Sequence, residues 1–146
     1  MLRKLIKINF QIRFVQYVSI FFLLSILNGQ FKEASVTFDE RLLREDEKSS
    51  LFNLKNGIKK FYTYTVWNNE YRDLELKLNI QLIFEGSANT GSSESFMVQS
   101  LFSNNKDLHF FDKGSQFSLN QNLSLYYDSV YYDPLSSLLG FYGNII

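Results

Sequence analysis

An alternating run of leucine and isoleucine is the feature that most constrains the fold of this chain. Apolar residues take every second position from Leu74 to Leu82, and Glu, Lys, Asn and Gln fill the positions between them. Successive side chains of a β-strand point to opposite faces, so this period predicts a strand with one buried and one exposed face. The residues expected on the buried face are Leu74, Leu76, Leu78, Ile80 and Leu82.

A helix that precedes this strand is expected to cover its buried face. Between about residues 48 and 64, apolar side chains recur three or four residues apart, and lysines occupy the other side of the predicted helix. Asp46 and Ser49 are the candidate N-caps. The apolar residues are Leu51, Leu54, Ile58 and Phe61.

Two further elements complete the predicted fold. Ala34, Val36 and Phe38 alternate and predict a short first strand. Asp133 is a natural N-cap and Pro134 suits the first helical position, which predicts a C-terminal helix over about 134–146. Sheets and helices that each have one apolar face need one another as cover. The predicted fold class is therefore α+β, a mainly antiparallel sheet covered by the two helices.

The first 29 residues have the pattern of a secretory signal peptide. A leader with four basic and no acidic residues precedes an apolar run from Tyr17 to Leu27, which is short for a membrane span, and the small residue Gly29 offers a cleavage position. The basic residues are Arg3, Lys4, Lys7 and Arg13. This pattern predicts a periplasmic protein, processed near Gly29–Gln30, with one domain over 30–146. An uncleaved anchor, a basic amphipathic targeting helix and a mitochondrial presequence are the alternatives.

Composition then excludes several classes of function. The chain has 15 basic and 15 acidic residues, so loss of the four basic leader residues leaves 11 against 15, a formal charge of −4. A mildly acidic domain is a poor match for nucleic acid or anionic lipid. The chain has no cysteine, which excludes disulfides and zinc–thiolate sites. Its 15 Phe, 9 Tyr and 1 Trp supply the material for a small core.

No group of residues predicts catalysis, a metal site or a cofactor. The single histidine, His109, lies near Ser103, Ser115, Asp107 and Asp112, but no strand–turn–helix elbow surrounds either serine. Basic residues interleave with the acidic run Asp39–Glu47, which favours ion pairs at the surface over metal ligation. Asn122 begins a glycosylation sequon that matters only where that machinery exists.

Aromatic residues are the candidates for binding and for packing. Tyrosine is enriched at protein interfaces, so the pairs in Tyr126–Tyr132 are possible contact residues, as is the strand from Phe96 to Phe102. The alternative, which the sequence by itself favours, is a strand with one tyrosine of each pair in the core. Trp67 directly follows the predicted helix and is expected to wedge its end against the sheet, with the indole N–H bonded. The candidate interface residues are Tyr126, Tyr127, Tyr131, Tyr132, Phe96 and Phe102.

The order of these features resembles the N-terminal half of the PorD-like family of Bacteroidota, which is associated with type IX secretion and gliding motility. Phe61 with Val66-Trp67 matches the family's helix-to-"KW" motif, Val98-Gln99-Ser100 its "VQS" strand, and Leu135 to Ile146 its "LSLLAFYAYIIG" helix. Two departures stand out: Leu101-Phe102 replaces the family's Arg-Pro, and family members are about twice as long, so a truncated chain is expected.

The resemblance implies a non-enzymatic accessory or docking component that binds proteins of an outer-membrane secretion complex, with no small-molecule substrate. Two alternatives come from other classes: a small exported ligand-binding or hydrolytic domain, and an accessory subunit of an organellar membrane complex. A deep pocket with convergent polar groups would favour the first alternative, and a shallow aromatic surface would favour docking.

Overall fold

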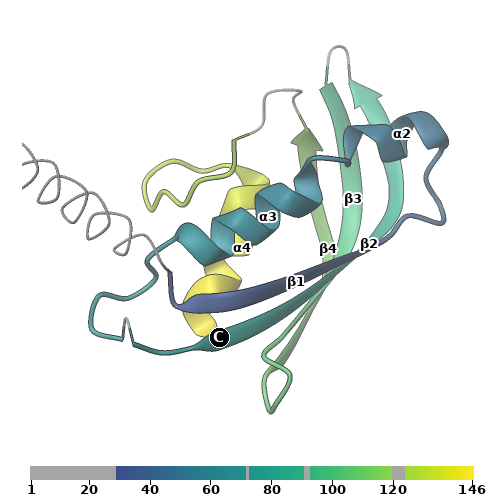
Figure 1. Ribbon diagram of the computed structural model, residues 1–146. Helices are drawn as coiled ribbons and strands as arrows, with labels where there is room; N and C mark the ends of the chain where they lie inside the picture. Colours follow the sequence, from purple (N-terminus) through teal and green to yellow (C-terminus); the bar gives the residue numbers. More distant parts are fainter. Residues whose placement is uncertain (1–28, 72, 91–92, 120–123) are drawn as a thin grey trace, which may run out of the picture.

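The computed structural model describes residues 29–146, with the exception of residues 72, 91–92 and 120–123 (Figure 1). The predicted leader up to residue 28 and the sequon asparagine at position 122 lie outside the described residues. Among the described residues, no helix is long and apolar enough to cross a membrane.

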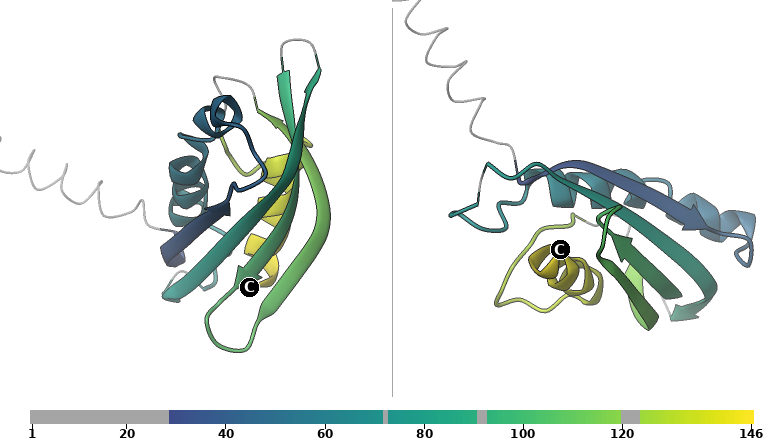
Figure 2. Two further views of the ribbon diagram at one scale, coloured as in Figure 1. Left: turned by 90° about the vertical axis from the view of Figure 1, so that its right-hand side faces the viewer. Right: turned by 90° about the horizontal axis from the view of Figure 1, so that it is seen from below.

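The described chain forms a four-stranded sheet with helices packed on one face. Its elements are β1 (Phe31–Asp39), α2 (Glu45–Ser50), α3 (Leu54–Tyr64), β2 (Leu76–Thr90), β3 (Ser93–Ser103), β4 (His109–Leu119) and α4 (Pro134–Ile145). The strand order is β1-β2-β3-β4; β1 runs parallel to β2, and the other pairs are antiparallel. The sheet is strongly curved and α4 lies in its hollow (Figure 2). The predicted α+β class is confirmed.

The alternating strand is present, although its first leucine lies outside the sheet. Leu78, Ile80 and Leu82 are buried as predicted, and Leu76 is half-buried. Leu74, by contrast, is 47% exposed, and the prediction of its burial was wrong. Pairing between β1 and β2 begins at Phe31 and Leu76, so no neighbouring strand lies beside residue 74.

The hairpin that joins β2 and β3 is longer than the sequence suggested. The polar segment Glu85–Ser95 has the composition of a turn region, yet residues up to Thr90 pair with a partner strand that starts at Ser93. Backbone hydrogen bonds between strands need no apolar side chains, so a polar segment can continue a ladder that the neighbouring apolar residues start. One residue bulges from the ladder between Phe84 and Gly86.

The predicted helix over about 48–64 divides into two helices. α2 ends at Ser50, the N–H of its C-cap residue Leu51 donates to the Lys48 carbonyl at 3.1 Å, and α3 starts at Leu54. All four predicted core positions are nevertheless buried, because the turn between the helices keeps them on one side. α3 packs mainly over β1, beside the strand that carries the leucines.

The C-terminal helix begins as predicted and completes the core. The Asp133 carboxylate accepts the Ser136 N–H at 2.8 Å, and Pro134 occupies the first turn. Leu135 and Leu139 are buried, and the Tyr142 ring stacks on Phe102 with centroids 4.0 Å apart. The buried apolar residues of α3, of α4 and of the inner face of the sheet belong to one hydrophobic cluster.

A buried tyrosine joins α3 to α4. The Tyr62 hydroxyl donates to the Leu139 carbonyl oxygen at 2.7 Å, and its side chain is fully buried. Burial raises the pKa of Tyr62 well above its ordinary value, so the hydroxyl remains a donor throughout the usual pH range.

Glu47 anchors α2 to the sheet. Neither Asp46 nor Ser49 caps the helix as predicted; instead Glu47 accepts the Arg44 N–H at 2.6 Å from within the first turn. Its other carboxylate oxygen accepts the Ser87 hydroxyl of β2 at 2.6 Å, and the Arg44 guanidinium lies 2.9 Å from the same oxygen. The Ser87 hydroxyl, the Arg44 N–H and the Arg44 charge hold the pKa of Glu47 below its ordinary value.

The Glu47 contacts predict a pH-dependent contribution to stability. The folded-state pKa is lowered, so ionised Glu47 stabilises the fold above the unfolded-state pKa of about 4.3, and this contribution is lost as pH falls through the folded value. Urea unfolding of Glu47→Gln should show a lower free energy of unfolding than the parent at pH 7, and the difference should shrink toward pH 3.

Glu45→Gln is the matched control, because Glu45 is 90% exposed and its ion pair with Lys48 lies at the surface. It should change stability little at either pH. An equal deficit of Glu47→Gln at pH 7 and pH 3 would contradict the role of its charge.

Candidate interaction surface

The tyrosine pairs lie on an exposed irregular segment, which we call the tyrosine loop and define as residues 124–133. No strand forms here, so the alternative of half-buried strand tyrosines was wrong. The large hydrophobic side chains of the loop with at least 40% exposure are Tyr126, Tyr127, Val130, Tyr131 and Tyr132. Exposed aromatic side chains gathered on one segment are unusual enough to mark a candidate contact surface.

The tyrosine loop is held to the fold by Tyr127. The Tyr127 ring packs against Gly140 of α4, where a Cβ added to the glycine would lie 2.8 Å from two ring carbons. Its hydroxyl accepts the Asn144 side-chain N–H at 3.2 Å, and its ring centroid lies 5.3 Å from that of Trp67. One tyrosine of the segment therefore anchors the loop, while the others remain exposed.

An aspartate turn shapes the tip of the loop. One Asp128 carboxylate oxygen accepts the N–H groups of Val130 and Tyr131, at 2.7 and 3.1 Å. These two backbone donors hold the pKa of Asp128 below its ordinary value. Because the turn directly precedes Tyr131 and Tyr132, it limits the directions in which these rings can project.

Trp67 occupies the place that the sequence predicted. Its indole N–H donates to the Tyr62 carbonyl at 3.3 Å, and its ring lies edge-on to Phe31 of β1 with centroids 5.9 Å apart. The six-membered part of the indole ring lies against Gly143 of α4, where an added Cβ would overlap it. Trp67 is half-buried and wedges the end of α3 against β1 and α4.

Phe96 and Phe102 are not contact residues. Both side chains are fully buried, and Phe102 stacks on Tyr142 in the core. β3, which carries them, lies between β2 and β4, so both of its edges are already hydrogen-bonded. This part of the predicted interface was wrong, because alternation along β3 turns these rings to the covered face of the sheet.

The residues that were weighed for chemistry do not assemble into a catalytic site. In the described part of the chain no side-chain hydrogen bond joins His109 to a serine or an acid, although Ser103 lies opposite His109 in the β3–β4 ladder. Ser115 bonds Asp112 at 2.8 Å, and the Ser103 hydroxyl accepts the Asn105 N–H at 3.1 Å. The acidic run forms ion pairs such as Asp39 with Arg41 at 2.7 Å. Among the described residues no group of acids and histidine is arranged to hold a metal.

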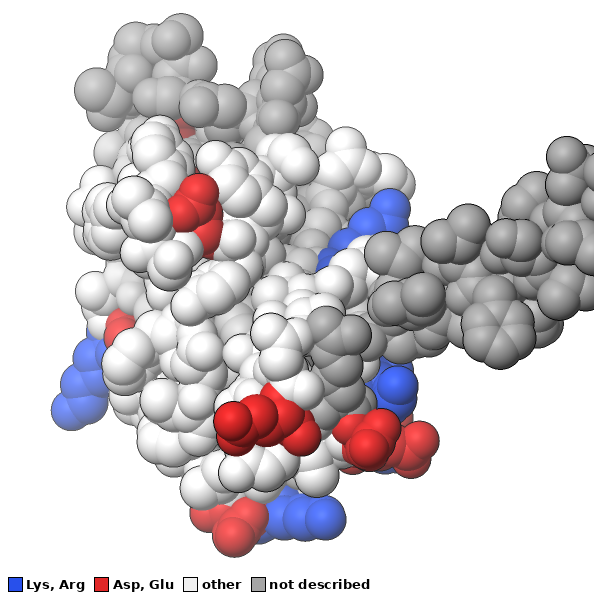
Figure 3. Space-filling model, turned by 90° about the vertical axis from the view of Figure 1, so that its left-hand side faces the viewer, with Lys and Arg blue, Asp and Glu red and all other residues white. Residues whose placement is uncertain are grey.

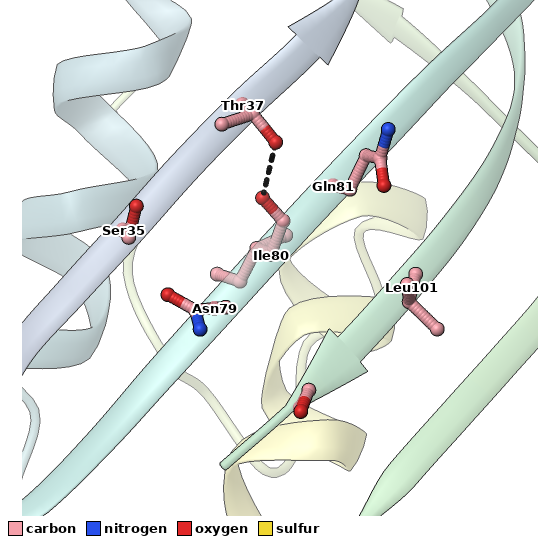
Figure 4. Close-up of a pocket in the computed structure, with 7 residues that line it drawn as sticks. Ser35, Thr37, Asn79, Ile80, Gln81 and Leu101 are labelled. Atoms are coloured by element: carbon pink, nitrogen blue, oxygen red, sulfur yellow. Dashed lines mark hydrogen bonds between the residues drawn. The ribbon is translucent and has the colours of Figure 1, made fainter. Parts of the chain in front are cut away.

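A shallow hollow lies on the sheet face opposite the helices. Thr37, one of its lining residues, donates to the Ile80 carbonyl at 3.3 Å within the sheet (Figure 4). The hollow is open to solvent, and its lining combines hydroxyl and amide side chains with the apolar residues Ile80 and Leu101, without a charged group. Its lining residues are Ser35, Thr37, Asn79, Ile80, Gln81, Leu101 and Ser103.

Comparison with known proteins adds no relative: no family model matches the chain, and neither the curated proteins nor the solved structures contain a significant match. The resemblance to the PorD-like family therefore stays a prediction from its motifs.

The close fit of Trp67 against Gly143 predicts a destabilised Gly143→Ala variant. A methyl group there would overlap the indole ring, and the cost of overpacking, about 1–3 kcal/mol, should exceed the roughly 1 kcal/mol that alanine gains in a helix. We expect a lower melting temperature and a red shift of fluorescence, since Trp67 is the only tryptophan of the chain.

Gly114→Ala provides the control for this experiment, because nothing lies within 4 Å of a Cβ at position 114. Unchanged fluorescence and melting of Gly143→Ala would show that Trp67 does not pack on α4.

Proposed function

We propose that this protein is a non-enzymatic docking subunit of the cell envelope, exported to the periplasm, which binds a partner protein through the tyrosine loop. The observation that carries the proposal is that this loop has exposed tyrosine rings on a backbone that is held in place by hydrogen bonds and ring packing. Tyr131 and Tyr132 are 64% and 74% exposed, while Tyr127 and Asp128 hold the backbone that directly precedes the tip.

Such an arrangement favours binding for an energetic reason. A tyrosine buries a large area at an interface with few rotatable bonds to order, and its hydroxyl keeps a hydrogen-bonding function. Binding also costs less conformational entropy when the loop is already held in one shape. The hydrogen bonds of Asp128 and Asn144 supply that support here.

The charge around the loop indicates how a partner would be recognised. No lysine or arginine occurs after Lys113, and the only acids in this region, Asp128 and Asp133, both accept backbone N–H groups. On the side of the molecule that Figure 3 shows, charged side chains form small separate groups between broad uncharged areas. Contacts through aromatic rings and hydroxyls are therefore expected to dominate, with a weak dependence of affinity on salt.

The cell machinery in which the protein would act is proposed from its sequence motifs. The resemblance to the PorD-like family supports a partner in the outer-membrane complex of type IX secretion. Among the described residues no side-chain hydrogen bond joins His109 to its cross-strand neighbour Ser103, and this is in keeping with a role without catalysis.

A photo-crosslinking experiment in the native cell envelope tests the docking surface. A benzophenone amino acid placed at Tyr131 should give a covalent adduct with an envelope protein. The same probe at Phe111, an aromatic residue of β4 with 51% exposure, is the matched control and should give none. Equal labelling from both positions, or from neither, would count against the tyrosine loop.

Paired substitutions test whether the exposed rings supply affinity. The crosslinking experiment identifies the partner, and affinity purification then measures its binding. The double variant Tyr131→Ala, Tyr132→Ala should recover about tenfold less of that partner than the parent, as expected for interface hot spots. The melting temperature should stay close to that of the parent, because changes at exposed sites shift stability by about 0.5 kcal/mol or less. Undiminished recovery would place the partner elsewhere on the protein.

A further inference from the structure

The junction between the predicted leader and the domain is built into the fold. Gly29 and Gln30 are both buried, and they lie at the carboxyl end of α3. The position is informative because the small residue Gly29 was the expected cleavage position.

Gly29 belongs to the cap of α3. The last carbonyl groups of a helix lack hydrogen-bond donors within the helix, and in α3 three other residues provide those donors. Thr65 bonds the Phe61 carbonyl, the Trp67 indole bonds the Tyr62 carbonyl, and the Gly29 N–H donates to the Thr63 carbonyl at 2.8 Å. Residue 29 thus completes the end of a helix far from it in the sequence.

The backbone around Gly29 admits no side chain. A Cβ at this position would overlap the Thr65 carbonyl oxygen and lie 2.8 Å from the Thr63 carbonyl oxygen. Both obstacles are backbone atoms, which cannot rotate away as a flexible side chain can. The absence of a side chain at position 29 is therefore a requirement of the fold, independent of the preference of signal peptidases for small residues.

Gln30 closes the loop that follows α3. Its side-chain N–H groups donate to the carbonyls of Asn68 and Tyr71, at 2.7 and 3.0 Å. Its side-chain oxygen accepts the N–H groups of Trp67 and Asn68, at 2.8 and 2.9 Å. Gln30 is only 3% exposed, so these bonds replace those that water would make.

We propose that processing of the leader leaves Gly29 on the mature chain, so that the cut falls N-terminal to Gly29 and not at the Gly29–Gln30 bond. The proposal rests on export of the protein and does not depend on the docking role. A cut after Gly29 would remove the N–H group that donates to the Thr63 carbonyl and would leave that carbonyl at the end of α3 without this donor. After folding, the burial of Gly29 and Gln30 would keep a protease from that bond.

The chemistry of an N-terminal glutamine gives a second reason. When glutamine is the first residue, its α-amine can attack the side-chain amide carbon; a C–N bond forms, the bond to the side-chain nitrogen breaks, and ammonia leaves. That reaction would remove the donor to Asn68 and Tyr71. An amine at Gly29, by contrast, would lie at the negative end of the α3 dipole, where a positive charge is favourable.

The first residue of the processed protein is the direct test. Intact mass and N-terminal peptide sequencing of the protein from its native envelope should show a chain that retains Gly29. A chain that starts at Gln30, or at Gln30 lighter by one ammonia, would overturn the proposal. A mass equal to that of the unprocessed chain would overturn it too.

A Gly29→Ala substitution in the full-length chain distinguishes a requirement of the fold for glycine from a requirement of the signal peptidase for a small residue. Alanine is a small residue that a signal peptidase accepts, so a role of Gly29 in processing alone predicts no change in cleavage or in melting temperature. The overlap with the Thr65 carbonyl predicts a melting temperature lower by about 5 °C or more, with Gly114→Ala as the unchanged control. Equal melting of the two variants would show that Gly29 lies outside the fold. Failure of the docking experiments would leave both results intact.

Discussion

The packing of Trp67 is the contact on which the arrangement of the other elements depends. Its ring meets Phe31 at the start of β1, Phe61 at the end of α3 and the Gly143 backbone of α4. Its indole N–H also donates to the Tyr62 carbonyl, one of the last carbonyl groups of α3. One side chain thus sets the distances among a strand and two helices that are far apart in the sequence, and a change in its position would alter all of them together.

The same contact reaches the candidate interface. Tyr127 lies against both Trp67 and Gly140, so the tyrosine loop takes its position from the core of the protein. Gly140 and Gly143 stand on α4 three residues apart, and each accepts one aromatic ring where any side chain would exclude it. The support for the proposed docking surface is therefore the same packing that stabilises the monomer, whereas the outer rings Tyr131 and Tyr132 are left exposed.

Patterns of residues close together in the sequence correctly predicted features that depend on short-range interactions. The period of two in β2, the period of the helices and the Asp133 cap all appear, because each depends on residues close in sequence. Leu74 failed because its burial required a neighbouring strand that starts only at Phe31. Phe96 and Phe102 failed as contact residues because an aromatic residue in a strand has the same local pattern whether its face is covered or open. Composition singled out the tyrosine pairs as possible contact residues, but it predicted neither that they lie on a loop nor that Tyr127 anchors it.

By itself, the sequence predicted the α+β class, the alternating strand, the apolar faces of the helical segments, the absence of cysteine chemistry and the tyrosine pairs. Only the tertiary structure decided which ring is an anchor, which glycines are seats for aromatic rings, and that Glu47 bonds Ser87 and Gly29 bonds Thr63. The physical reason is the range of the interactions. Periodicity and capping act within a few residues, whereas these contacts join positions more than thirty apart, or two elements, and exist only after the sheet and the helices have packed.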